Sequence, residues 1–170
     1  MKRIISVLVE NRFGSFDRVA TMFSGKGFNI DSISIGQTEI AEVSRMTIVT
    51  EGDDQILDQV VKQLNRLIDT IKVVDLSREA KTVRELALIK VGHESNSIQE
   101  LKNLSDIFRG KVVDINNKTI TLEITGPPEK IDAAVNDFLP YGIKEMARSG
   151  TIAMKRGEQV TPNHKKSKSK

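Results

Sequence analysis

The apolar residues follow a pattern that occurs twice along the chain and alternates between the two-residue period of strands and the 3.6-residue period of helices. Residues 3–10 (RIISVLVE) predict a strand rich in β-branched side chains. A helix is predicted next, because apolar residues at i, i+3, i+4 and i+7 would form one apolar face: Phe16, Val19, Ala20 and Phe23. Two strands, a second helix and a last strand come next, up to residue 76. The predicted order of this first unit is βαββαβ.

The same order begins again after a short charged linker, SREAKT. The fold class we predict is α+β, with two tandem ferredoxin-like (βαββαβ) domains whose antiparallel sheets carry their helices on one face. The predicted segments are residues 1–77, a linker at 78–82, a second domain at 83–157 and a basic flexible tail at 158–170. A sheet covered on one side only, with a strand of alternating Ile and Ser at its edge, favours pairing with a copy of itself, so we expect a homodimer.

Composition excludes several kinds of site. The chain has no cysteine and two histidines, which lie far apart in the sequence, so thiolate chemistry is excluded and a metal site is not expected. No serine or lysine stands in a catalytic motif, and we expect no enzymatic activity and no catalytic residue. No apolar run approaches the roughly 18 residues that span a bilayer, and the first apolar run predicts a strand rather than a signal peptide. We therefore expect a cytoplasmic protein that binds no membrane.

Charge is concentrated in the tail. After residue 150 the chain carries six Lys or Arg and one acid, so a net charge of +3 leaves the first 150 residues at about −2. An RNA-binding module that uses this tail is one hypothesis. An RNA-recognition sheet also needs exposed aromatic residues on its central strands, and the predicted strands carry none, so no nucleic-acid partner is expected.

The glycine-rich stretch ENRFGSFDRVATMFSGKGFNI, at residues 10–30, is the candidate binding site. Only Gly14 lies in the strand-to-helix turn, so the three-glycine fingerprint of a dinucleotide loop is missing. A helix start near Ser15 suits one small anion, such as a carboxylate, and Asn11 offers a donor and an acceptor. A plain turn that starts the helix, and a helix cap at Asn29, remain the alternatives at this stage. The second copy aligns Val112 with Asn29, so only the first copy would carry the site.

The stretches RIISVLVENRFGSFDRVATMFSGKGFNIDSISIG, SRMTIVTEGD, FRGKVVDI and EMARSGTIAMKRG resemble the regulatory small subunit of acetohydroxyacid synthase, also called acetolactate synthase, over roughly residues 1–157. The resemblance implies an N-terminal ACT domain and no active site in this chain. It also implies that the chain activates a large catalytic subunit, which carries thiamine diphosphate, a divalent metal (Mg) and FAD, and imposes feedback inhibition by valine. A free-standing ACT-type amino-acid sensor that acts on another partner is the alternative function.

The same resemblance implies which residues bind the effector, between two ACT domains of a dimer. The turn residues that it implies are Asn11, Phe13, Gly14 and Ser15. The second asparagine is Asn29, with Ile30 beside it. Ile33 or Ile35 would line an apolar pocket. Phe13, preceded by Arg12, departs from the small acidic or polar residue common before the glycine. Valine, leucine and isoleucine are not separable from the sequence, because one methylene changes binding by only about 1 to 3 kcal/mol.

Overall fold

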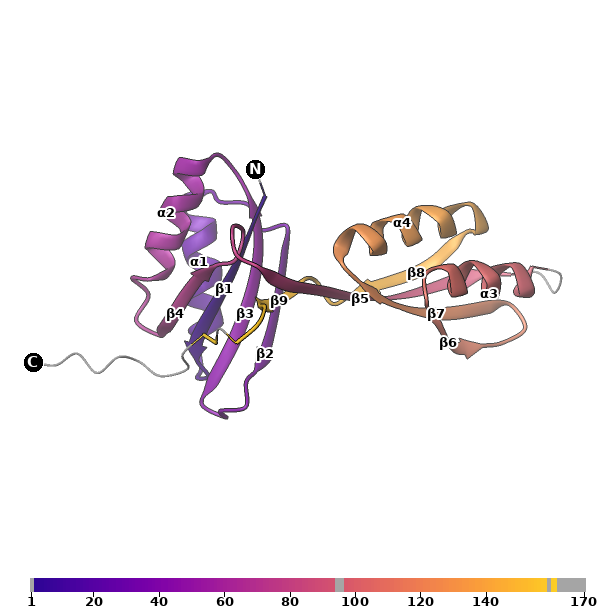
Figure 1. The fold of residues 1–170 in the computed structure, drawn as a ribbon, viewed down its shortest axis with the longest axis horizontal. Coiled ribbons are helices and arrows are strands. Elements are labelled where there is room, and N and C mark those ends of the chain that lie inside the picture. The colour runs from indigo at the N-terminus through magenta and orange to yellow at the C-terminus, as the bar shows by residue number, and fades with distance from the viewer. Residues whose placement is uncertain (1, 94–96, 159, 162–170) are drawn as a thin grey trace, which may run out of the picture. The chain divides into compact units, whose positions relative to one another are not determined.

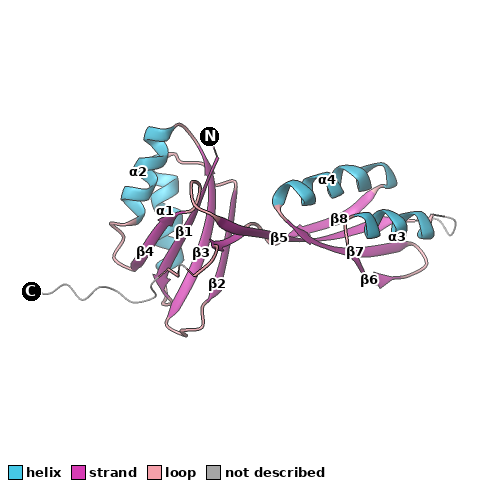
Figure 2. Cartoon of the chain, viewed as in Figure 1, coloured by secondary structure: helices cyan, strands magenta, loops and turns pink. Residues whose placement is uncertain are grey.

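The computed structural model describes residues 2–93, 97–158 and 160–161, and these form two compact units (Figure 1). The first unit contains residues up to Thr82 together with those from Thr151 onward, and the second contains Val83–Gly150. Both units have the predicted βαββαβ order, with helices on one face of an antiparallel sheet (Figure 2). The predicted fold class is confirmed.

The first unit has a four-stranded sheet in the order β2-β3-β1-β4. Its elements are β1 (Lys2–Glu10), α1 (Ser15–Lys26), β2 (Ser32–Gln37), β3 (Val43–Glu51), α2 (Asp54–Leu64) and β4 (Thr70–Asp75). One face of β1 and β3 packs under the two helices, and their alternate residues form the core with Val19 and Phe23 of α1. Among the described residues, β2 is an edge strand that pairs with β3 alone.

Local sequence sets both ends of the helices in this unit. α1 ends at Gly27, whose φ of 68° is a left-handed conformation that glycine adopts without strain. α2 begins at Asp53, whose carboxylate accepts a hydrogen bond from the Ile56 amide at 2.8 Å. By contrast, Gly14 at the start of α1 offers no capping side chain. The first turn of α1 is therefore left without the usual side-chain acceptor.

The second unit has the strand order β6-β7-β5-β8. Its elements are β5 (Lys81–Gly92), α3 (Ile98–Ile107), β6 (Lys111–Ile115), β7 (Thr119–Gly126), α4 (Pro128–Phe138), a 3₁₀ turn η1 (Leu139–Tyr141) and β8 (Ile143–Arg148). Ala87, Ile89 and Val91 of β5 are fully buried beneath α3 and α4. Pro128 stands in the first turn of α4, where its missing N–H costs no hydrogen bond.

The predicted end of the second domain at residue 157 differs from the structure. An additional strand, β9 (Ile152–Lys155), pairs with β5 and belongs to the first unit. The amide of Thr151 donates to the hydroxyl of Ser32 at 3.0 Å, and β9 lies across β1 on the face without helices. This contact gives the first sheet a partial cover, because Leu8 and Val49 on that face are 0% and 3% exposed.

The second unit begins at Val83, as predicted, although strand β5 already begins at Lys81 within the predicted linker. One further prediction needs correction. Val112 does not correspond to Asn29, because it pairs with Leu122 inside β6, as Ile35 pairs with Met46 in the first unit. The likeness is misleading because GFNID, at residues 27–31, is the loop between α1 and β2, whereas the similar letters KVVD belong to strand β6. Most of the basic tail predicted at 158–170 lies outside the described residues.

Candidate effector site

The predicted turn connects the end of β1 to α1 and leaves the start of this helix accessible. Gly14 has φ 82° and ψ −4°, a left-handed conformation suited to glycine. The amide of Asn11 donates to the carbonyl of Glu42 at 2.7 Å, and its side-chain nitrogen donates to the carbonyl of Ala41 at 2.9 Å. These two bonds hold Asn11 beside the turn and leave its side-chain oxygen to accept a further bond.

Ser15 is the buried polar residue of this turn. Its side chain is 4% exposed, and within the described part of the chain its hydroxyl has no hydrogen-bond partner. The first N–H groups of a helix also have no intrahelical acceptor. A hydroxyl and several amides thus lie together at the positive end of α1, which is the arrangement that a carboxylate needs.

An ion cluster that the sequence did not reveal lies next to the turn. Asp69 is 2% exposed, and its carboxylate accepts hydrogen bonds from Arg12, with Nε at 2.7 Å, and from Arg18. Burial raises the pKa of Asp69, but the hydrogen bonds and positive charges of the two arginines outweigh it and hold the pKa below its ordinary value. The two guanidinium groups are therefore engaged by a carboxylate of the chain itself.

Asn29 lies at the other end of α1. Its carbonyl oxygen accepts a hydrogen bond from the Thr50 hydroxyl at 2.5 Å, and its side-chain nitrogen donates to Asp31 at 2.6 Å. α1 has 12 residues, so its ends are about 18 Å apart at 1.5 Å per residue. Asn11 and Asn29 of one chain therefore cannot contact the same small ligand.

The apolar candidates differ in exposure. Ile30 and Ile33 are half-buried and pack against the core of the first unit. Ile35 lies on the same face of β2 and is 47% exposed, beside the unpaired edge of the sheet. Phe13 is 99% exposed and contributes nothing to the packing of its own chain. One chain thus brings together Asn11, Gly14 and Ser15, and separately Asn29 with Ile30.

A first βαββαβ domain with an accessible helix start, followed by a second domain of the same topology, defines a protein with tandem ferredoxin-like domains of the ACT type. Two family models agree with this class: residues 5–72 match the "AHAS small subunit-like ACT domain", and residues 84–157 match the "Small subunit of acetolactate synthase". The chain belongs to the family of acetolactate synthase small subunits.

Known relatives support the assignment over nearly the whole chain. The chain is 51% identical to the acetolactate synthase small subunit of Aquifex aeolicus, over 91% of this chain and 81% of that protein. It is 44% identical to the acetolactate synthase small subunit of Bacillus subtilis, over 94% and 93% of the two chains. The crystal structure of the small subunit from Thermotoga maritima superposes with a TM-score of 0.86 at 37% identity, covering 94% of this chain and 99% of that one. The resemblance read from the sequence is confirmed.

Proposed function

We propose that this chain is a regulatory subunit that binds the catalytic subunit of acetolactate synthase, raises its activity and makes it sensitive to valine. Family membership supports the catalytic partner, because the relatives bear the name of small subunits of that enzyme. Thiamine diphosphate, Mg and FAD belong to the catalytic subunit in this proposal, and this chain contributes regulation only. The observation that carries the effector site is the start of α1, where the buried hydroxyl of Ser15 has no hydrogen-bond partner among the residues that the structure describes.

A homodimer through β2 makes the two separated asparagines parts of one site. If β2 of one copy pairs antiparallel with β2 of a second copy, the first residue, Ser32, faces the last, Gln37. Gln37 also pairs with Ser44, at the end of the sheet where β1 leads into the turn. The Asn29 end of one chain then lies beside the turn of the other. Two equivalent sites result, each with parts from both chains.

Valine fits the chemistry of such a composite site. Its carboxylate would accept hydrogen bonds from the first amides of α1 and from the Ser15 hydroxyl of one chain. Its ammonium would donate to the side-chain oxygen of Asn11 or of Asn29 from the other chain. Its isopropyl group would contact Ile33 or Ile35 beside the dimer edge. Leucine and isoleucine remain competing effectors for the same pocket.

Regulation follows because the effector would bridge two subunits. Binding at the interface favours one arrangement of the dimer, and an arrangement that changes contacts with the catalytic subunit changes its activity. The coupling is reciprocal, so the catalytic subunit must also change the affinity for valine, typically by about 1 to 3 kcal/mol.

Reconstitution tests the proposal. The purified chain is added to an acetolactate synthase catalytic subunit, and acetolactate formation is measured with and without valine. The proposal predicts higher activity on addition of the chain and a loss of that activity with valine. Absence of both effects would contradict it, and valine binding without any effect on the enzyme would favour the free-standing amino-acid sensor.

A further inference from the structure

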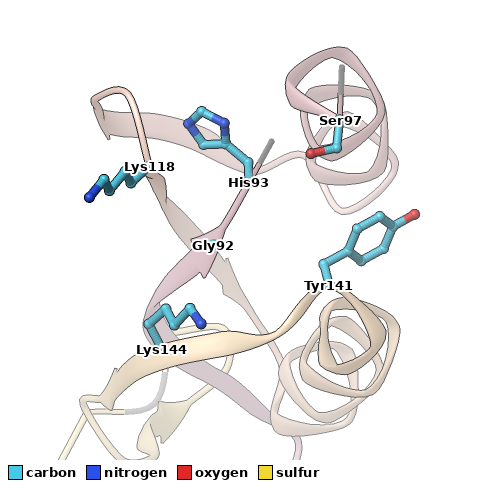
Figure 3. Close-up of a pocket in the computed structure, with 6 residues that line it drawn as sticks. All are labelled: Gly92, His93, Ser97, Lys118, Tyr141 and Lys144. Atoms are coloured by element: carbon cyan, nitrogen blue, oxygen red, sulfur yellow. The ribbon is translucent and has the colours of Figure 1, made fainter. Parts of the chain in front are cut away.

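The second domain contains an open hollow of about 420 Å³ at the end of β5. It is lined by Gly92, His93, Ser97, Lys118, Tyr141 and Lys144. Figure 3 shows Lys118, His93 and Ser97 along one side and Lys144 with Tyr141 along the other, with Gly92 between them. The volume is within the usual range of pockets for small molecules, about 300 to 1,000 Å³. Family membership and the proposed effector site in the first domain do not account for this hollow.

The hollow occupies the place in the second domain that the effector turn has in the first. In both domains the strand before the turn changes register at its last paired valine, where Val9 pairs with Thr70 and Val91 with Ile143. This correspondence matches Glu10 with Gly92 and Asp69 with Gly142. The backbone confirms the match: Glu10 N donates to Asp69 O at 2.9 Å, and Gly92 N donates to Gly142 O at 3.2 Å.

A second pair of backbone bonds extends the match. Asn11 N donates to the carbonyl of Glu42 at 2.7 Å, and His93 N donates to the carbonyl of Lys118 at 3.0 Å. Lys118 therefore stands where the first domain has Glu42. Three carboxylates around the first turn, at Glu10, Glu42 and Asp69, are replaced in the second domain by two glycines and a lysine.

The replacement reverses the local charge. In the first domain Asp69 binds Arg12 and Arg18, so the positive charges there are already neutralised. In the second domain Lys118 and Lys144 have no carboxylate within ion-pair distance among the described residues. Two ammonium groups beside one hollow, without an ion-pair partner in the described part of the chain, favour an anion.

Gly92 and Tyr141 shape the hollow around these lysines. A Cβ at position 92 would lie 2.8 Å from Cε of Lys144, so a larger residue there would displace the end of the Lys144 side chain. The Tyr141 hydroxyl donates to the carboxylate of Glu100 at 2.7 Å, which engages the nearby acid of α3. The lysine charges are thus left for a ligand.

We propose that this hollow binds the phosphate group of a small molecule, with Lys118 and Lys144 as its two cationic ligands. Lysine binds phosphate as a compact point charge. It does not require the planar, two-bond geometry with which arginine binds a carboxylate or phosphate. The inference does not rest on valine binding or on the catalytic partner, because the residues involved belong to the second domain alone.

Intrinsic fluorescence provides a direct test, since Tyr141 is the single tyrosine and the chain has no tryptophan. The complete chain is titrated with inorganic pyrophosphate and, separately, with glycerol phosphate, against sodium chloride of equal ionic strength. A saturable change in Tyr141 fluorescence is expected with at least one phosphate compound and not with chloride. Preference for glycerol phosphate would indicate a phosphorylated metabolite, and preference for pyrophosphate a free phosphate anion.

Matched variants assign the signal to the lysines. Lys118→Glu restores the carboxylate found at Glu42 of the first domain and should abolish saturation. Lys144→Gln should raise the dissociation constant about tenfold, the loss expected for one charged hydrogen bond. Lys111→Gln removes the same charge at the far end of the β6–β7 hairpin and should change the constant less than twofold. Thermal unfolding confirms that each variant is folded. No saturable change in the parent with either compound, or unchanged binding in Lys118→Glu, would overturn the proposal.

Discussion

Nε of Arg12 lies 2.7 Å from the carboxylate of Asp69, which is 2% exposed although its partner is half-exposed. The two residues are 57 positions apart in the sequence, and their ion pair fixes the turn before α1 against the segment before β4. The turn that we propose for valine binding is therefore supported by a buried charge and does not depend on the effector for its shape.

Asp69→Asn should lower the free energy of unfolding by about 2 kcal/mol at pH 7, because the arginines lose a charged acceptor. The folded-state pKa of Asp69 is lowered, so its carboxylate stabilises the fold above the unfolded pKa of about 3.9. That stability is lost as the pH falls through the lower folded-state value. Urea unfolding at several pH values should show the parent and the variant converging below about pH 4. Asp137→Asn, on an exposed position of α4, is the control. A difference that stays constant down to pH 2 would contradict this account.

Ser15→Ala should separate stability from binding. The buried hydroxyl has no partner in the described chain, so its removal should leave the free energy of unfolding unchanged or raise it by up to about 1 kcal/mol. Calorimetry should show weaker valine binding by about tenfold, since one donor to the carboxylate is lost. A clear loss of stability with unchanged valine affinity would assign Ser15 a purely structural role.

Ile35→Lys should weaken the proposed dimer. Its side chain is 47% exposed at the unpaired edge of the sheet, where pairing with a second copy would bury a charge without a partner. Sedimentation equilibrium should show a dimer dissociation constant raised at least tenfold. Ile56→Lys changes a residue of α2 that is 39% exposed and should leave the constant unchanged. Equal effects of the two variants would place the dimer contact elsewhere.

Ala153→Asp tests whether residues after 150 belong to the first domain. Ala153 of β9 is 6% exposed, so a carboxylate there should lower the free energy of unfolding by about 3 kcal/mol. Met154→Asp, at a neighbouring residue that is 57% exposed, should cost much less. Hydrogen exchange should locate the loss of protection in β1. A loss of protection in the second domain instead would support the domain boundary predicted at residue 157.

The two βαββαβ units could be predicted from the sequence because most of their helices and strands show a clear apolar period. β9 could not, since TIAMK is too short for a clear period and its contacts, such as Thr151 with Ser32, are long-range. Val112 was aligned wrongly because similar letters occupy a loop in the first unit, at residues 27–31, and strand β6 in the second. Gly14 and Asn11 were recognisable as turn residues. The role of Asp69 could not be predicted, because its ion pairs with Arg12 and Arg18 join residues that are far apart in the sequence.

The central claim is that each effector site combines the turn of one chain with Asn29 of another. Gly14→Asp should damage the turn, and Asn29→His should damage the part of the site that the other chain contributes. Each variant alone should then fail to bind valine or to transmit its inhibition, and should still stimulate the catalytic subunit. In a mixed dimer of the two variants, one site receives both damaged halves and the other receives both intact halves.

Titration calorimetry of the mixed variants with valine, after subunit exchange, tests this claim most directly. The composite site predicts that valine binding reappears on mixing, at about a quarter of the parent's sites, because random exchange makes half of the dimers mixed and each mixed dimer regains one of two symmetric sites. The recovered sites should have the parent's affinity. A mixture in which exchange is demonstrated but no valine binding reappears would contradict the claim, and so would normal valine binding by either variant alone.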